Sequence, residues 1–503
     1  MRDSRPLLTE PRPLEVLTRL PFYPWLIVGT VCVGAFLGQL DASIAGLVLP
    51  TLEETFSAPV ANVAWVSIAY LVTLAALVVP FGRLADLAGR KLLYTGGFVV
   101  FIVGSALCGF APNLGWLIAF RVLQAVGAAM LQANSVAIIT AAVVRRRLGR
   151  AIGVQGAAQA IGLSVGPSVG GLLIDTLGWR WVFFIAVPFG LLGTLLAWLV
   201  LPRSSVQRTH ERFDWLGALL LGPSVALSLL ALTFANDWGW TSPTFLGVSM
   251  AAAVCLGLFL ANERCATSPL VDMSLFNSRT FSVGITAGLL SYSVLFGALF
   301  VLPFFLERVL GRTASEAGVL LSPIPLALAV IAPLAGLLTD RRGARLPTVL
   351  GMLLSAVALV ALAFFPTGDA RLLVLLLALF GVGMGLFTPP NNSAIMGTAP
   401  ANRLGVAGGI LNMTRSLGTS LGVALTGALL GILLSAQTGE HVEGTLDVDP
   451  AALQVAVQQT LLLLAALAVV AGLLSAVRGS AAVPREVSSS ASPTTGRVSP
   501  AAR

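Results

Sequence analysis

The sequence predicts an all-α polytopic membrane protein with fourteen membrane-spanning helices, and three observations support this fold class. Of the 503 residues, 56% are hydrophobic and only 10% are charged, whereas a soluble domain carries about 25% charged residues. Apolar runs of about 20 residues, the length that crosses a bilayer, recur along the chain. Lys and Arg gather in alternate connections between these runs, as is typical of membrane proteins.

Fourteen apolar runs are long enough to span a bilayer. They lie at 25–49, 62–81, 93–111, 115–137, 152–174, 181–201, 215–235, 244–262, 281–303, 318–338, 348–366, 372–394, 407–434 and 455–477. The first run is too long for a signal-peptide core and lacks a small-residue cleavage site, so we expect it to remain as a span. A polar tail at 1–22 precedes it, and the tail at 479–503, rich in Ser, Pro and Ala, is expected to be disordered.

The basic residues predict the orientation of the chain. With a cytoplasmic N-terminus, 24 of the 30 Lys and Arg residues fall on the cytoplasmic side. Four fall on the outer side, and Arg121 and Arg415 lie within spans. The positive-inside rule therefore predicts a multi-pass protein of the cytoplasmic membrane with both termini in the cytoplasm.

One short segment occurs twice, as GRLADLAGRK at 82–91 and as GLLTDRRGAR at 336–345. The positions of interest are Gly82, Asp86, Gly89 and Arg90 in the first copy and Gly336, Asp340 and Gly343 in the second. We expect both copies to be loops, with Asp86 placed to favour the positive end of the helix that follows.

The two copies divide the chain. Transporters built from two six-helix repeats show such internal similarity, but these copies are eight spans apart. We therefore expect a six-helix half at 23–202, two inserted helices at 203–264 and a second six-helix half at 265–478.

Two opposite charges are expected deep in the membrane. Asp41 lies eight residues before the outer end of the first span, about 12 Å deep at 1.5 Å per residue, and Arg121 lies at nearly the same depth in the fourth span. A buried carboxylate is costly unless it is paired or neutralised, so we expect the two side chains to meet. Two interpretations remain: a static structural ion pair, or a coupling site where Asp41 alternates between a proton, Arg121 and a cationic substrate.

The fifth span carries a stripe of small residues. Gly162, Gly166 and Gly170 recur every four residues, and Pro167 lies among them. Such a stripe lets another helix approach closely, and proline lets the helix bend. Gly153 and Gly171 fall on the opposite side of the helix. An ordinary helix interface is one interpretation; the other is a close, bendable contact with the other half of the molecule.

Several motifs together resemble one family. LDASIAGLVLP at 40–50 resembles the LDxTIVNVALP motif of fourteen-helix drug:proton antiporters, with Ser43 for Thr and Gly46 for Asn. RVLQAVG at 121–127 resembles their RxxQGxG motif, with Ala125 for Gly, and the spacing of glycines from Gly153 to Gly171 resembles their fifth-helix motif. The chain is therefore identified as similar to this family of the major facilitator superfamily.

The resemblance implies a function as well as a fold. It implies that Arg121 assists proton transfer and that the segment beginning at Gly82 latches the two halves, although Leu87 replaces a usual basic residue. It also favours export. The expected function is proton-coupled export of small amphipathic or cationic compounds, with a dedicated exporter of one metabolite and a nutrient importer as alternatives.

Other polar residues in the spans have two interpretations. Residues that could line a substrate pathway are Gln124, Asn134, Asn391, Asn392 and Arg415. Hydrogen bonds between helices are the alternative for the asparagines, and snorkelling to the interface is one for Arg415. Glu307 is expected to be interfacial, with a second proton site as its alternative.

Several function classes are disfavoured. Lys91 is the only lysine, so a phosphate-binding GxxxxGK[ST] loop is absent from the sequence. No Cys/His cluster suggests a metal and no loop carries a convergent catalytic set, so we expect neither an enzyme nor a cofactor. The expected partners are the lipid bilayer, a small-molecule substrate and protons, without nucleic acid, and the chain is expected to be monomeric.

Overall fold

A computed structural model describes residues 10, 12–204, 212–364, 369–438 and 450–478. Within these ranges the chain is helical and contains no strand. Fourteen of its helices are long and apolar enough to cross a membrane, so the prediction of a fourteen-helix polytopic fold is confirmed. The expected disorder of 479–503 concerns residues outside the described ranges.

The long helices follow the predicted order. In the N-terminal half they are α2 (Tyr23–Leu47), α4 (Val60–Ala88), α5 (Arg90–Gly109), α6 (Leu114–Ala142), α7 (Leu148–Leu177) and α9 (Ala186–Val200). The next two are α10 (Trp215–Trp238) and α11 (Pro243–Cys265). In the C-terminal half they are α12 (Arg279–Phe304), α14 (Pro323–Arg342), α15 (Arg345–Ala363), α16 (Ala370–Thr398), α17 (Leu404–Thr438) and α18 (Pro450–Val477).

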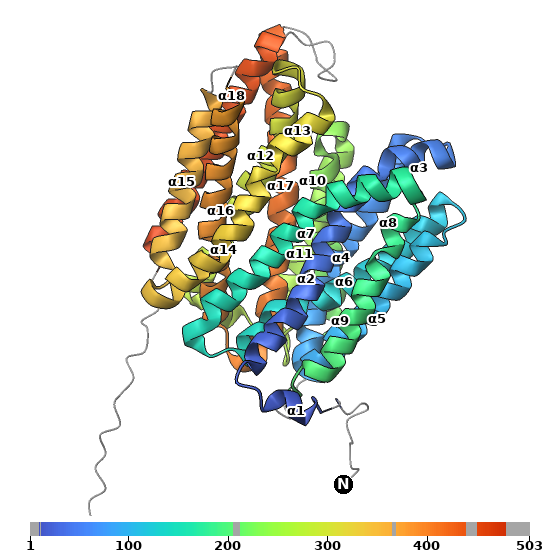
Figure 1. Cartoon of the computed structure of the whole chain (residues 1–503), viewed down its shortest axis with the longest axis vertical. Helices are drawn as coiled ribbons and strands as arrows, with labels where there is room; N and C mark the ends of the chain where they lie inside the picture. Colours follow the sequence, from blue (N-terminus) through green and yellow to red (C-terminus); the bar gives the residue numbers. More distant parts are fainter. Residues whose placement is uncertain (1–9, 11, 205–211, 365–368, 439–449, 479–503) are drawn as a thin grey trace, which may run out of the picture.

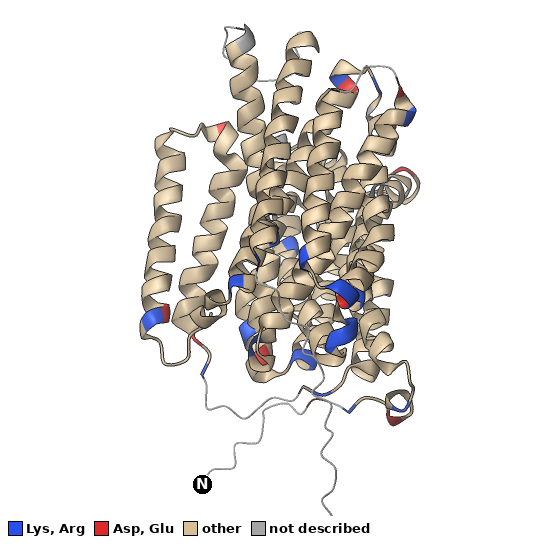
Figure 2. Cartoon of the chain, turned by 90° about the vertical axis from the view of Figure 1, so that its left-hand side faces the viewer, with Lys and Arg blue, Asp and Glu red and all other residues tan. Residues whose placement is uncertain are grey.

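Short helices cap the bundle. They are α1 (Glu15–Thr18), α3 (Leu49–Phe56), α8 (Trp181–Phe184) and α13 (Ala314–Leu321). The helix ends and connections that carry Arg90, Lys91, Arg145–Arg150 and Arg341–Arg345 lie at one end of the bundle, which we call the basic end. Figure 2 shows Lys and Arg gathered towards its lower part. The end that carries α3 and α13 is the opposite end (Figure 1).

Helices of the two halves meet in two matching pairs. Helix α4 packs against α17, and α7 packs against α14. The halves lie together near the basic end and diverge towards the opposite end (Figure 1). Helix α10 contacts α4 and α17, whereas the main neighbour of α11 is α10. Helices α10 and α11 therefore lie beside the junction of the halves.

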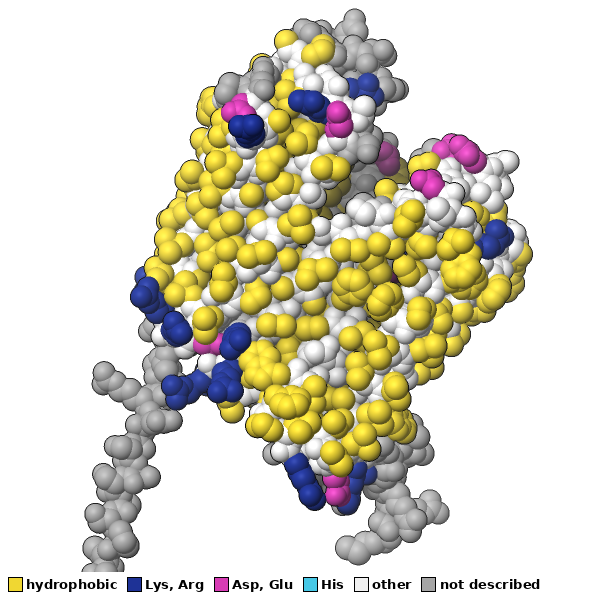
Figure 3. Space-filling model, in the orientation of Figure 1, with side chains coloured by type: hydrophobic (Ala, Val, Ile, Leu, Met, Phe, Trp, Pro, Cys, Tyr) yellow, Lys and Arg dark blue, Asp and Glu magenta, His cyan; other side chains and the backbone are white. Residues whose placement is uncertain are grey.

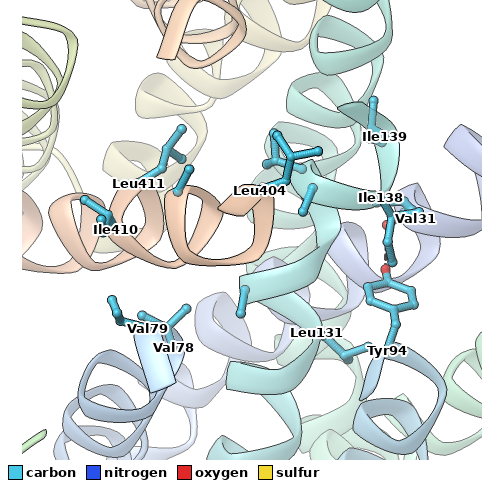
Figure 4. Close-up of a cluster of buried hydrophobic side chains, with 14 of the residues drawn as sticks. Val31, Val78, Val79, Tyr94, Leu131, Ile138, Ile139, Leu404, Ile410 and Leu411 are labelled. Atoms are coloured by element: carbon cyan, nitrogen blue, oxygen red, sulfur yellow. Dashed lines mark hydrogen bonds between the residues drawn. The ribbon is translucent and has the colours of Figure 1, made fainter. Parts of the chain in front are cut away.

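The largest buried hydrophobic cluster crosses this junction. It joins Val78 and Val79 of α4 to Ile410 and Leu411 of α17. Figure 4 shows Val78 and Val79 beside the stretch of α17 that carries Ile410 and Leu411. The same cluster contains Tyr94, whose hydroxyl donates a 3.2 Å hydrogen bond to the carbonyl oxygen of Val31 (Figure 4). A second cluster lies within the C-terminal half.

The two repeated segments are not loops, contrary to the expectation. Helix α4 continues to Ala88, so Asp86 lies in its last turn, and Gly89, with φ 114°, makes the turn to α5. Helix α14 likewise continues to Arg342 and ends at Gly343, with φ 81°. The apolar run marks only the part of a helix inside the bilayer core, while Leu, Ala and Arg, which are good helix formers, extend it further.

The outer surface is largely apolar. Figure 3 shows hydrophobic side chains over most of the visible face, with Lys and Arg clustered towards its lower end. Helix α11 has few buried residues, and Leu246 and Met250 are exposed on it. Such a surface suits contact with lipid chains.

Candidate functional site

Asp41 of α2 and Arg121 of α6 form a buried ion pair. A guanidinium nitrogen of Arg121 lies 2.9 Å from a carboxylate oxygen of Asp41, and their side chains are 1% and 4% exposed. Burying two charges is tolerated only when they are paired and their remaining hydrogen-bonding groups are satisfied. The two side chains that the sequence places at equal depth are therefore in contact.

Gln124 closes this pair into a triad. Its amide nitrogen donates to Asp41 at 2.8 Å, and its amide oxygen accepts from Arg121 at 2.6 Å. The same amide nitrogen donates to the Ser105 hydroxyl at 2.7 Å, which connects the triad to α5. Each member thus constrains the other two, so a change at one carboxylate oxygen alters the whole network.

The rest of the Arg121 side chain is held by the N-terminal half. Its Nε donates to the carbonyl oxygen of Val66 at 3.0 Å, and its guanidinium carbon lies 4.2 Å from the centre of the Tyr70 ring. Gly104 allows α5 to approach, since a Cβ there would lie 2.6 Å from the Cα of Gln124. Sequence analysis missed Ser105, Val66 and Tyr70, and nothing in their spacing distinguishes them from ordinary span residues.

Asp86 of α4 caps a helix of the other half. Its carboxylate accepts hydrogen bonds from the backbone N–H groups of Gly405 at 2.9 Å and Val406 at 3.1 Å, in the first turn of α17. Arg90 donates to the same carboxylate at 2.8 Å and to the carbonyl oxygen of Ala401 at 2.6 Å. A carboxylate is stabilising at a helix N-terminus because it meets unpaired N–H groups and the positive end of the helix dipole. The helix it favours is α17, not the expected α5.

Asp340 of α14 repeats the arrangement in the opposite direction. It accepts from the backbone N–H groups of Gly149 at 2.7 Å and Arg150 at 2.9 Å, in the first turn of α7. We call these two contacts, Asp86 on Gly405–Val406 and Asp340 on Gly149–Arg150, the two latches. Both join the N-terminal half to the C-terminal half near the basic end.

The backbones touch at both latches. A Cβ at Gly149 would lie 2.5 Å from the carbonyl oxygen of Gly336, and Gly82 faces Gly405 in the same way. Sequence analysis missed Gly149 and Gly405. A signal existed, because LGRAIG at 148–153 and LGVAGG at 404–409 share Leu-Gly-x-Ala-x-Gly at the starts of α7 and α17.

The glycine stripe of α7 packs within its own half. A Cβ at Gly162 would lie 2.6 Å from the carbonyl oxygen of Phe36, and Gly166 and Gly170 face Ser43 and Ile44 of α2. The expected contact with the other half is therefore wrong for the stripe. Helix α7 does run unbroken through Pro167.

The contact with the other half comes from the opposite face of α7. Gly153 faces Ala332 of α14, so close packing does account for this residue, whereas a Cβ at Gly171 would meet nothing within 4 Å. Helix α17 repeats the stripe on α12, where a Cβ at Gly418 would lie 2.7 Å from the carbonyl oxygen of Leu289.

A cavity of about 940 Å³ lies between the halves. Helices α2 and α7 line it on one side, and α12, α14, α16 and α17 line it on the other. Leu47 near the end of α2 and Val319 of α13 place its mouth towards the opposite end. Its walls are mainly apolar, with polar side chains such as Gln39 and Gln159. Among the described lining residues, Arg415 is the only charged one.

The comparisons with known proteins identify the family. The profile of the Major Facilitator Superfamily matches residues 31–423. The chain belongs to this superfamily. It is 34% identical over 401 residues to the riboflavin transporter RibZ of Clostridioides difficile, covering 79% of this chain and 87% of that one. It is 33% identical over 411 residues to the multidrug resistance protein Stp of Mycobacterium tuberculosis, covering 82% and 76%.

A solved structure supports the fold. The proton:xylose symporter XylE aligns with a TM-score of 0.61 at 14% identity, covering 90% of this chain and 94% of that one. This likeness concerns the fold. The expected superfamily and its multidrug-efflux family are thus confirmed, and the chain is a multi-pass membrane transporter for small molecules.

The predicted pathway residues of this transporter lie in different places. Arg415 lines the cavity, and Gln124 belongs to the triad. Asn134 donates to the carbonyl oxygen of Met130 in its own helix at 2.8 Å. Asn391 donates to the carbonyl oxygen of Gly284 at 3.0 Å. Neither these asparagines nor Asn392 are among the lining residues.

Arg478 and Glu307 are also not among the described lining residues of the cavity. Asn391 also accepts a hydrogen bond from Arg478, which follows the last helix, and burial lowers the pKa of the Arg478 guanidinium to about 10. Glu307 lies in a π-helical turn, Phe305–Val309, that follows α12. Across the described part of this transporter, no group of three or more His, Cys, Asp or Glu is placed to hold a metal ion.

Proposed function

We propose that this protein exports small amphipathic compounds, drugs and antibiotics among them, in exchange for protons. The basic end faces the cytoplasm in this proposal, and both termini are cytoplasmic. The observation that carries the proposal is the pairing of closed latches at the basic end with a cavity whose mouth lies towards the opposite end. These are the features of a transporter held facing outwards, as alternating access requires.

The triad is the proposed proton site. Protonation of Asp41 removes its charge and with it the ion pair to Arg121, while Arg121 keeps its bonds to Gln124 and Val66. A proton that enters from outside would therefore loosen α2 from α6 without leaving the guanidinium unbonded.

Helix α2 connects the triad to a latch and to the cavity between the halves, which we call the cargo cavity. It lines the cavity through Gln39 and Ser43, and it packs on the glycine stripe of α7. The first turn of helix α7 contains Gly149, where Asp340 holds it to α14. In the proposed cycle a shift of α2 is carried along α7 to this latch, and opening of both latches exposes the cavity to the cytoplasm.

The proton gradient supplies the energy in this proposal, with no cofactor and no enzymatic step. Each charge that crosses a potential of about 100 mV contributes roughly 2.3 kcal/mol. A dedicated exporter of one metabolite would use the same machinery, and the breadth of its cargo would distinguish it. A nutrient importer would share the fold, but the glycine pattern from Gly153 to Gly171 resembles that of exporters.

Uptake into inverted membrane vesicles tests the proposal. A panel of antibiotics, lipophilic ions and metabolites is offered with and without a pH gradient, acid inside. We expect uptake of several amphipathic compounds to stop when the gradient is collapsed and to stop in Asp41→Asn. Asp175→Asn, which changes an exposed carboxylate on α7, is the matched control and should retain uptake. Uptake that persists without the gradient would refute proton coupling.

A further inference from the structure

Arg415 places a positive charge at the wall of the cavity between the halves. It lies on α17, and its guanidinium carbon is 5.9 Å from the centre of the Tyr292 ring. The structure gives it no hydrogen bond and no ion pair with any described residue, and among the described lining residues it carries the only charge.

Three other arginines of the bundle have hydrogen-bonding partners within the protein. Arg121 is paired with Asp41, Arg90 with Asp86, and Arg478 donates to Asn391. A cation inside a membrane protein is expensive, so an ionisable residue that lines an intramembrane cavity indicates an ion pathway or a counter-ion for a ligand. The missing partner of Arg415 is therefore expected to come from the cargo.

Asp41 does not offset this charge at the cavity wall. Its two carboxylate oxygens already accept from Arg121 and Gln124, its side chain is 4% exposed, and it does not line the cavity. The ion pair is neutral as a whole, so among the described residues Arg415 is the side chain that brings an unbalanced charge to the cavity wall. In a low-dielectric site such a field attracts anions and repels cations strongly.

The remaining walls suit an aromatic or aliphatic body. Phe296, Leu321 and Leu328 are apolar, while Gln39 and Gln159 can donate or accept hydrogen bonds without a charge. Tyr292 presents an aromatic ring beside the guanidinium. This combination resembles the general design of a ligand site, an apolar pocket with a few polar groups that fix orientation.

We propose that Arg415 binds the acid group of the cargo, so that the transporter prefers amphipathic compounds with a carboxylate or an ionised phenol over cations of the same size. This inference rests on the proposed function and narrows its cargo class. A guanidinium donates two parallel hydrogen bonds to a carboxylate, which gives orientation as well as charge selection.

The charge preference of the cavity can be measured without knowing the cargo. In a variant lacking the four native cysteines, Gln159→Cys places a thiol in the cavity and Thr55→Cys places one on the exposed surface of α3. Each thiol is reacted with an anionic and a cationic methanethiosulfonate reagent. We expect the ratio of the anionic to the cationic rate to be about tenfold higher at position 159 than at position 55.

Variants of Arg415 provide the controls for this ratio. Arg415→Gln should lower the ratio at position 159 and leave unchanged the ratio at position 55, which lies beside the exposed carboxylates of Glu53 and Glu54. Arg415→Lys should keep the ratio at position 159, and Arg371→Gln, at an exposed residue outside the cavity, should leave it unchanged. Equal ratios at the two positions, or a ratio at position 159 that Arg415→Gln leaves unchanged, would overturn the inference. Since Arg415→Lys retains the charge, it also shows whether loss of the ratio comes from loss of charge rather than from misfolding.

A matched set of compounds then tests the cargo class. Pyrenebutyrate, its neutral amide and pyrenebutylamine share one aromatic body and differ in charge. We expect transport of the acid to exceed that of the amine. Arg415→Gln should reduce transport of the acid about tenfold and leave transport of the amide unchanged. Equal transport of acid and amine would overturn the inference. Failure of all three to respond to a proton gradient would count against the proposed function, and the reagent ratio would still decide the role of Arg415.

Discussion

Asp86 and Asp340 each cap the first turn of a helix in the opposite half of the molecule. Asp86 of α4 accepts from Gly405 and Val406 at the start of α17, and Asp340 of α14 accepts from Gly149 and Arg150 at the start of α7. The relationship is reciprocal, so the two repeats are held together twice by the same chemistry. Closure near the basic end thus depends on two carboxylates, one near the end of α4 and one near the end of α14, which bind the first turns of α17 and α7.

Neutralising a latch should favour the open state of the basic end. Loss of a capping carboxylate costs about 1 kcal/mol, so Asp86→Ala or Asp340→Ala should shift the equilibrium between latched and open states roughly fivefold, and the double variant further. The reactivity of Ala332→Cys, a buried position on α14 that faces Gly153, reports opening when measured with a maleimide.

The control for this measurement is Glu15→Ala, which removes an exposed carboxylate on α1. It should leave the reactivity of position 332 unchanged. Equal reactivity in the Asp86, Asp340 and Glu15 variants would show that the two carboxylates do not hold the basic end closed.

A side chain at Gly149, where the backbones of α7 and α14 touch, should prevent the Asp340 latch from closing. A Cβ at Gly149 would lie 2.5 Å from the carbonyl oxygen of Gly336, which is backbone and cannot rotate away. Alanine favours a helix over glycine by about 1 kcal/mol, so helix propensity alone would make Gly149→Ala stabilising. We expect transport to fall at least about tenfold nonetheless. Gly431→Ala on α17, where a Cβ meets nothing within 4 Å, should retain transport.

The helices and the ion pair could be predicted from the sequence because both depend on strong local signals. A span must be apolar over its whole length, and an isolated charge such as Asp41 or Arg121 stands out against that background. Their similar depths then follow from counting residues. The lengths of the helices beyond the bilayer core could not be found in this way, which is why Asp86 was expected in a loop.

Which helices contact one another is harder to predict from the sequence. Gly162 and Gly153 lie on different faces of α7, and sequence alone does not say which neighbour each face meets. The partner of the stripe proved to be α2, in the same half, and the partner of Gly153 proved to be α14. Backbone acceptors such as the carbonyl oxygen of Val66 cannot be predicted from the sequence either, because every residue carries the same carbonyl group.

Two glycines of the same helix should respond differently to alanine. Gly162→Ala brings a Cβ within 2.6 Å of the carbonyl oxygen of Phe36 and should force α7 and α2 apart, whereas Gly171→Ala meets nothing within 4 Å. We expect Gly162→Ala to reduce both gradient-driven transport and the thermal stability of the purified protein. Gly171→Ala should match the wild type in stability, and a large loss of transport in it would indicate a role for Gly171 outside the packing described.

Removing one partner of the buried pair should be worse for stability than removing both. Asp41→Asn leaves the Arg121 guanidinium 1% exposed with only neutral partners, and breaking a buried pair in this way costs about 3–5 kcal/mol. Asp41→Asn combined with Arg121→Gln leaves no buried charge, so its melting temperature in detergent should lie above that of the single variant. Neither protein should couple transport to protons, since both lack the carboxylate. Proton-driven transport in either one would move the coupling site elsewhere, with Glu307 as the next carboxylate to test.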